Sequence, residues 1–134
     1  MFEQIMPGLV GESETKVVPE KTAQHLGSGS VSVFATPEMV LLMEMAGVAA
    51  VDHLLPEDYH TVGMRIDVSH LAATPLGMTV HARAELQRVE GRKLTFRVEA
   101  SDDLEKIGEG IHERMIINLA RFKERAEAKS ARKQ

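Results

Sequence analysis

The sequence predicts a single α+β domain in which one long, strongly apolar helix is wrapped by an antiparallel β-sheet. Residues 39–51 are almost entirely apolar or small, which is typical of a helix that is buried on every side. From about residue 64 onward, several segments instead alternate apolar and polar side chains, as strands with one buried face do. Because no other element is apolar enough to cover those strands, the sheet is expected to wrap the helix. The chain has 134 residues, which suits one domain with a core and leaves no room for two.

The first 35 residues show little periodicity. The Gly-Ser-Gly-Ser run at residues 27–30 predicts a flexible turn, and the alternation at 30–34 predicts a short extended stretch. No regular element is expected before that stretch.

The helix is expected to start at the sequence Thr36-Pro37-Glu38. A hydroxyl at the N-cap, proline at the first helical position and an acid in the first turn are all typical of a helix start. The helix is expected to cover residues 38–54, because Pro56 cannot continue it.

Four strands are expected after the helix, separated by turn signals. They cover residues 64–70, 79–86, 94–100 and 107–119. The second and third are expected to pair as a long antiparallel hairpin, and the glycines at 108 and 110 allow the last strand to bend or approach another backbone closely. One sheet leaves part of an all-apolar helix uncovered, so a homodimer or a larger symmetric assembly is expected.

Charge is unevenly distributed. The chain carries 16 Lys and Arg against 20 Asp and Glu, so its net charge of −4 gives no overall basic field for a nucleic acid. Residues 121–134 hold six basic and two acidic side chains, which leaves the rest of the chain at −8. We expect this segment to be a solvated helical tail of the domain. The alternative is that it attracts an anionic ligand such as a nucleotide phosphate.

The composition excludes several kinds of site. The chain has no cysteine, so it has no disulfide, thiolate nucleophile or cysteine-bound zinc, and we expect neither a metal nor a cofactor. The N-terminus lacks the features of a secretory signal, and the apolar run at 39–51 is too short to span a bilayer. A soluble cytoplasmic protein without a membrane partner is therefore expected.

Glu44 is the single charged residue in the apolar run 39–51. Burying an ionised carboxylate without a partner costs several kcal/mol or forces it to take up a proton. Glu44 therefore needs a partner, and a chemical role would explain why an acid stands there. The alternative is a structural ion pair with Arg114 or Arg65.

Thr36 and His70 are the side chains that best complement Glu44. His70 falls on the apolar face of its strand, so a contact with Glu44 is sterically reasonable. Thr36 precedes Glu44 by eight positions, which on a helix is about 12 Å along the axis and about 80° around it. The two share a pocket only if the substrate is extended or a second copy contributes to it.

The three residues suit a hydrolytic reaction. A histidine can act as general base and acid, a carboxylate can orient it or attack, and a hydroxyl at a helix N-terminus lies where negative charge is stabilised. Each has a structural alternative as well: Thr36 as a helix cap, His70 as a hydrogen-bonded core histidine, and Glu44 as an ion-pair partner.

Several segments together resemble one known family. They are Val33-Phe34-Ala35-Thr36 through Met43-Glu44, Val68-Ser69-His70 through Val80, Val89-Glu90-Gly91-Arg92, and Ile107-Gly108-Glu109-Gly110-Ile111-His112-Glu113-Arg114. In these segments the chain resembles the fluoroacetyl-CoA thioesterase family of hot-dog-fold proteins, over most of its length from Lys21 onward. The resemblance implies a dimeric hot-dog enzyme that hydrolyses an acyl-CoA to a carboxylic acid and free CoA.

The resemblance also implies site residues. The family's catalytic threonine, glutamate and histidine fall on Thr36, Glu44 and His70 with both intervals preserved. Substrate-binding roles are implied for Phe34, for Gly63 near the start of the histidine strand and for Arg114 in the last strand.

The chain departs from the family in the segment before Thr36. In the fluoroacetyl-specific enzyme that segment is longer and carries phenylalanines that form a lid over the acyl pocket, whereas here it reads Gly-Ser-Gly-Ser-Val-Ser at residues 27–32. Met45 also replaces an aromatic residue that commonly follows the family glutamate. Because small residues cannot exclude water or grip a small acyl group as aromatics do, a broader or different short acyl-CoA substrate is expected.

The expected mechanism uses His70 as general base and later acid. Glu44 either attacks the thioester carbonyl to give a mixed anhydride or activates water, and Thr36 positions Glu44 or the carbonyl oxygen. Two alternatives remain at this point: a non-catalytic acyl-CoA-binding hot-dog module, and a hot-dog enoyl-CoA hydratase or dehydratase that leaves the thioester intact.

Overall fold

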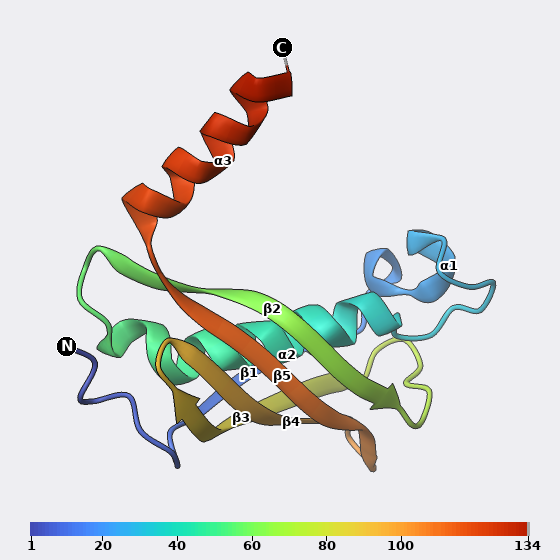
Figure 1. Cartoon of the computed structure of the whole chain (residues 1–134). Helices are drawn as coiled ribbons and strands as arrows, with labels where there is room; N and C mark the ends of the chain where they lie inside the picture. Colours follow the sequence, from blue (N-terminus) through green and yellow to red (C-terminus); the bar gives the residue numbers. More distant parts are fainter. Residues whose placement is uncertain (134) are drawn as a thin grey trace.

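A computed structural model describes residues 1–133 and shows a five-stranded antiparallel sheet that curves around one long helix (Figure 1). The strands are β1 (Val10–Lys16), β2 (Tyr59–His70), β3 (Thr79–Glu90), β4 (Lys93–Ser101) and β5 (Lys106–Asn118). The helices are α1 (Ala23–Leu26), α2 (Thr36–Val51) and α3 (Leu119–Lys133), with 3-10 turns at Pro19–Lys21 and Asp52–Leu54. The sheet order is β1-β3-β4-β5-β2, so β2 is an edge strand.

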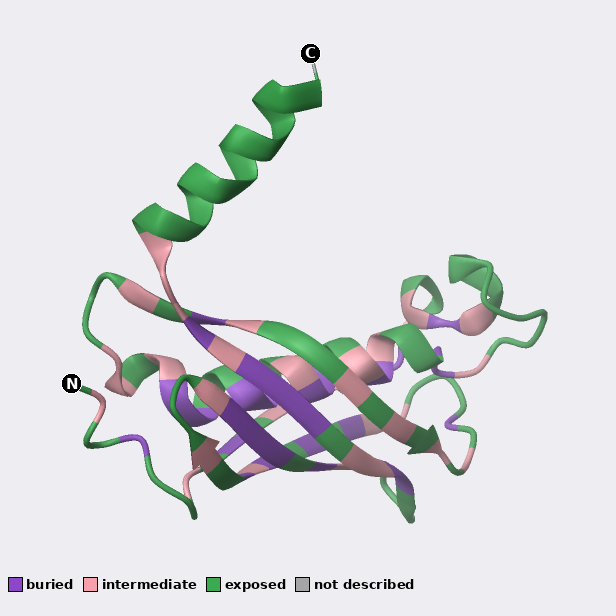
Figure 2. Ribbon diagram, viewed as in Figure 1, coloured by how far each residue is buried: buried purple, intermediate pink, exposed green. Residues whose placement is uncertain are grey.

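The core lies between α2 and the concave face of the sheet. The apolar faces of β3 and β4 are fully buried there, including Leu86 and Phe96, and they pack against Met39, Met43 and Ala46 of α2 (Figure 2). This is the α+β arrangement that the sequence predicted.

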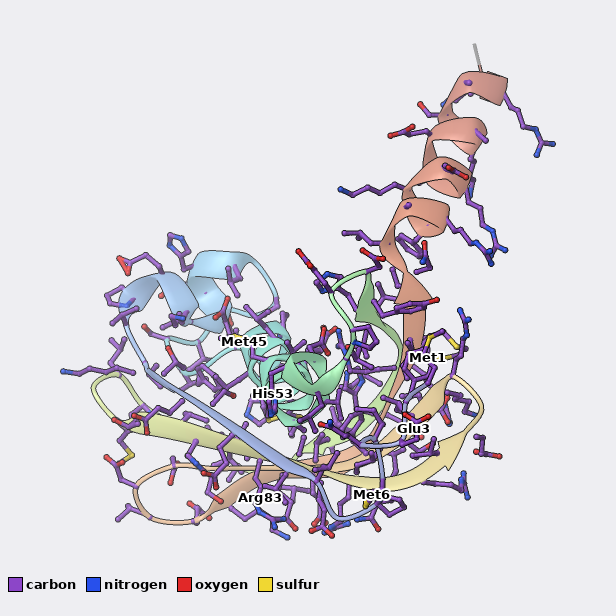
Figure 3. All side chains as sticks on the ribbon, turned by 90° about the vertical axis from the view of Figure 1, so that its left-hand side faces the viewer. Met1, Glu3, Met6, Met45, His53 and Arg83 are labelled. Carbon is purple, nitrogen blue, oxygen red and sulfur yellow. The ribbon has the colours of Figure 1, made fainter. Side chains whose placement is uncertain are left out.

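One side of α2 is not covered by the chain. Leu41, Met45 and Val48 are 48%, 49% and 39% exposed, although the helix is apolar on all faces. Figure 3 shows Met45 on the side of α2 that faces away from the strands β3 and β4. The prediction that a single sheet leaves part of this helix uncovered is therefore confirmed.

The start of α2 differs from the prediction. Ala35 is the N-cap, with an extended backbone and a carbonyl that accepts from the amides of Glu38 and Met39. Thr36 is consequently the first helical residue and Pro37 the second. The expectation that the Thr36 hydroxyl caps the helix is wrong, and that hydroxyl is free for another partner.

The four predicted strands are present, with β2 and β3 longer than expected, but β1 was not predicted. Among the described residues it pairs only with β3, and its buried position is Gly11, so it carries no alternation of large apolar side chains. Ser13 instead donates a hydrogen bond of 2.6 Å to the Leu42 carbonyl of α2. A strand that contacts a helix through glycine and serine leaves little hydrophobic signal in the sequence.

The C-terminal segment is the helix α3, which projects from the body of the domain (Figure 1). Its side chains are exposed from Ala120 to Lys133, as a solvated tail requires. Within residues 1–133, no helix has both the length and the apolar character that crossing a membrane demands.

Gly11 provides a test of this packing. A Cβ at this position would overlap the α2 backbone around Ala46, Ala49 and Ala50, which cannot move without shifting the core. We expect Gly11→Ala to lower the free energy of unfolding by about 3 kcal/mol, measured by urea denaturation.

Gly29→Ala is the matched control, because a Cβ there would make only an ordinary contact, 3.5 Å from the Ala23 side chain. Equal stability of the two variants would contradict the close approach of β1 to α2.

Candidate active site

The start of α2 and the end of β2 bring Thr36 and His70 together. The Thr36 Oγ1 lies 2.7 Å from the His70 Nδ1, so the hydroxyl bonds the imidazole instead of capping the helix. Both residues line an open cavity of about 360 Å³. We call this cavity and its two polar side chains the Thr36–His70 half-site.

The segment before α2 forms one wall of that cavity. Its lining includes Ala23 of α1, Ser28 of the Gly-Ser turn, and Val33 and Phe34 just ahead of the helix. Phe34 is 1% exposed, so it serves as a fixed wall rather than a mobile cover. The other residues of this wall are small.

The imidazole of His70 is suited to accept a proton at neutral pH. Burial lowers the pKa of His70 below its ordinary value, and a backbone hydrogen bond with Ala72 acts in the opposite direction. The ring is therefore neutral at pH 7. Its Nε2 is buried and has no hydrogen-bond partner among the described residues, so this nitrogen can serve a substrate, a water or a group from outside the chain.

Glu44 lies in a different cavity, of about 240 Å³, against the middle of β2. Its Oε2 is 3.6 Å from the Nη1 of Arg114, and its side chain is 39% exposed. Gly63 makes room for it, because a Cβ at that position would lie 2.6 Å from the Glu44 Oε2. We call this cavity and its charged groups the Glu44 half-site; its lining is Glu44, Gly63, Met64, Arg65, Ile66 and His112.

Arg114 is held firmly beside Glu44. Its Nε donates to the Thr61 hydroxyl at 2.8 Å and its Nη2 to the Thr61 carbonyl at 3.0 Å. The Thr61 hydroxyl in turn donates to Asp52 at 2.6 Å. Burial lowers the pKa of Arg114, while the negative charges of Asp52 and Glu44 act in the opposite direction.

The ion-pair partner of Glu44 is Arg114. Of the two arginines considered, Arg114 is the ion-pair partner, whereas Arg65 pairs with Asp67 and Glu113. The expected contact between Glu44 and His70 does not occur within one chain. The carboxylate lies beside Gly63, and seven residues of extended strand, about 23 Å, separate Gly63 from His70.

Three polar residues around Glu44 were not predicted: Asp52, Thr61 and His112. The position of His112 could have been predicted from the sequence, because His112 lies on the same face as Arg114 in the predicted strand 107–119. The roles of Asp52 and Thr61 depend on the 3-10 turn and on the true start of β2, neither of which the sequence pattern indicated.

The chain matches proteins of known activity along most of its length. A model of the fluoroacetyl-CoA-specific thioesterase family matches residues 17–120. The fluoroacetyl-CoA thioesterase of Streptantibioticus cattleyicolor is 44% identical over 130 residues, covering 90% of this chain and 94% of the relative.

Solved structures agree with these matches. The structure of the fluoroacetyl-CoA thioesterase FlK superposes with a TM-score of 0.86 at 40% identity, covering 93% of this chain and 97% of the other. A thioesterase superfamily member from Thermus thermophilus gives a TM-score of 0.88 at 33% identity, covering 96% and 95%. A hot-dog-like protein from Thermanaerovibrio acidaminovorans gives 0.87 at 25% identity, covering 95% and 94%.

The predicted resemblance and hot-dog fold are both confirmed. The pairing of a threonine with a neutral histidine, with a carboxylate on the same helix, suits the hydrolysis that these relatives are named for. The chain belongs to the fluoroacetyl-CoA-specific thioesterase family of hot-dog thioesterases.

Proposed function

We propose that this protein hydrolyses a short acyl-CoA to a carboxylic acid and CoA, using Thr36, His70 and Glu44. The observation that carries the proposal is the 2.7 Å contact between the Thr36 hydroxyl and a neutral His70 whose Nε2 has no described partner. Such a pair can move a proton during attack on a thioester and return it to the leaving thiolate. The reaction needs only side chains and water, so neither a metal nor a further cofactor is proposed.

The proposal includes a homodimer, because one chain leaves two compatible surfaces uncovered. The strand β2 has 12 residues and pairs only with β5, so its outer edge is unpaired within the described chain. The apolar side chains of Leu41, Met45 and Val48 are also exposed on α2. A second copy that adds its β2 antiparallel to this edge would cover the edge and bring the two apolar helix faces together.

The same pairing would complete the site. Antiparallel pairing about a two-fold axis sets the beginning of one β2 beside the end of its copy. Gly63, which adjoins Glu44, lies in the first half of β2, and His70 ends the strand. We therefore propose that the Glu44 half-site of one protomer faces the Thr36–His70 half-site of its partner, with two such sites in each dimer.

Within that composite site, we assign a role to each group. His70 acts as general base and then as general acid, and Thr36 holds its imidazole by the hydroxyl contact. Glu44 either activates the water that attacks the thioester carbonyl, or attacks the carbonyl itself to give a mixed anhydride and the CoA thiolate. In the second route a water deprotonated by His70 hydrolyses the anhydride, which releases the acid and frees Glu44, and the proton on His70 goes to the thiolate. Gly63 leaves room for the Glu44 carboxylate, and Arg114 holds it by charge.

The substrate is proposed to be a short acyl-CoA that is not restricted to fluoroacetyl-CoA. Solved structures of the relative FlK include complexes with fluoroacetate, with CoA and with acetyl-CoA. In this chain the cavity wall before α2 is formed by Ala23, Ser28 and Val33 together with the buried Phe34. A wall of this kind encloses a two-carbon acyl group less tightly than aromatic side chains would.

A cytoplasmic location remains a prediction from the sequence.

The first test measures the turnover of a panel of acyl-CoAs, from acetyl-CoA upward, by the native chain and by Glu44→Ala. Turnover is detected as release of free thiol. We expect native turnover of short acyl-CoAs and a loss of at least about 100-fold in kcat for the variant. Glu105→Ala, which removes an exposed carboxylate in the β4–β5 turn, is the control and is expected to keep native activity. Binding without thiol release by the native chain would rule out the hydrolase.

The second test mixes two inactive variants, Glu44→Ala and His70→Ala, by joint unfolding and refolding. If the site combines the two protomers, each mixed dimer regains one intact site, so random mixing restores about a quarter of native activity. If each chain carries its own complete site, the mixture stays as inactive as its components. Size-exclusion chromatography of both variants before mixing checks that they still assemble.

A further inference from the structure

His112 is the one buried histidine of the Glu44 half-site, and its hydrogen bonds define its protonation state. Its Nδ1 is 2.8 Å from the Arg65 carbonyl oxygen, which can only accept, so Nδ1 carries a proton. Its Nε2 is 3.1 Å from the Nη1 of Arg114, which can only donate, so Nε2 carries a lone pair. His112 is therefore neutral, and its lone pair is directed at Arg114.

The surroundings fix the ring in this orientation. His112 is 1% exposed, and its ring stacks on Phe96 with centroids 6.3 Å apart. Gly47 of α2 allows the side chains of Arg114 and His112 to lie close to the helix. A Cβ at this position would be 3.2 Å from the Arg114 Cδ and 3.5 Å from the His112 Cδ2. Burial and the two hydrogen bonds of the ring hold its lone pair toward Arg114.

Within residues 1–133, the guanidinium of Arg114 is hydrogen-bonded to neutral groups alone. Two of its bonds go to Thr61 and the third to His112, while Asp52 reaches it only through the Thr61 hydroxyl. An acid in place of His112 would cancel the charge of Arg114 locally. A neutral acceptor holds the same N–H group and leaves the positive charge to act on Glu44.

The distance from Arg114 to Glu44 shows the effect of this arrangement. The Nη1 to Oε2 distance is 3.6 Å, longer than the 2.7–2.9 Å that is usual for hydrogen bonds between a guanidinium and a carboxylate. Glu44 is thus paired by charge without giving up its oxygen lone pairs to a close bond. Those lone pairs are what an attacking or water-activating carboxylate uses.

We propose that His112 is a positioning residue for the reaction, whose Nε2 lone pair keeps Arg114 beside Glu44 while preventing it from closing onto the carboxylate. This inference rests on the proposed function, in which Glu44 is the reacting carboxylate. His112 acts through Arg114 and need not touch the substrate.

The test compares His112→Phe, which keeps a ring but has no acceptor, with His112→Gln, which can return an acceptor oxygen near the Nε2 position. For His112→Phe we expect kcat to fall by about tenfold or more, with KM within about twofold of native. His112→Gln is expected to recover most of that loss. A crystal structure of His112→Phe should show the Arg114–Glu44 distance shortened to about 2.8 Å.

Ile116→Ala controls for a general loss of stability, because Ile116 is buried on the same face of β5 as His112 and Arg114. It is expected to lower Tm without lowering the kcat of the folded protein. Equal losses of kcat in the Phe and Gln variants, or native kcat in His112→Phe, would overturn the proposal.

A measurement on the native chain covers the case in which His112→Phe does not fold. Nitrogen-15 NMR of the imidazole at pH 7 should show a protonated Nδ1 and an unprotonated Nε2 for His112; the opposite tautomer, or a doubly protonated ring, would overturn the proposal. A native chain that hydrolyses no acyl-CoA would instead overturn the proposed function. In that case the His112 tautomer of the native chain and the Arg114–Glu44 distance in His112→Phe still decide whether His112 holds Arg114.

Discussion

The burial of α2 against the concave face of the sheet is the constraint on which the rest of the structure depends. The helix carries both the Thr36 that begins it and the Glu44 at its centre, so its placement sets where both half-sites lie. Close packing is possible because glycines replace side chains where strands meet the helix. A Cβ at Gly11 would overlap the helix backbone, and one at Gly108 would lie 2.5 Å from the Met39 sulfur.

The charge of Glu44 on α2 is balanced by Arg114, which belongs to one connected network of polar side chains. Glu44 would be costly in an apolar helix if it were alone, but it is 39% exposed and faces Arg114, whose three nitrogens each form a hydrogen bond with Thr61 or His112. The network joins the end of α2 through Asp52, the start of β2 through Thr61 and the last strand through Arg114. The position of the carboxylate thus depends on three elements that are distant in the sequence.

Much of the fold was predictable because its signals are local. The apolar run of α2 and the period-two alternation of β2 to β5 each identify an element without knowledge of its neighbours. The strand β1 escaped prediction because it meets α2 through Gly11 and Ser13, which carry no hydrophobic alternation. The cap at Ala35 escaped because a threonine before a proline is an equally good helix start by sequence.

The contacts between the predicted site residues could not be predicted from the sequence. Spacing and resemblance indicated Thr36, Glu44 and His70, yet strand parity alone could not show that His70 meets Thr36 while Glu44 meets Arg114. Those contacts depend on which part of β2 lies against which part of α2. That alignment is set by tertiary packing and cannot be read from the strand pattern. His112 carried a usable signal, the parity that it shares with Arg114 in β5.

We propose that the two half-sites meet across a dimer. The most direct measurement is a crystal structure of the assembled protein with CoA bound. We expect the Glu44 carboxylate of one protomer and the partner's His70 to lie within about 3.5 Å of one common point, where a thioester carbonyl would sit. A monomer, or a dimer in which the carboxylate and the imidazole open into separate cavities, would contradict it.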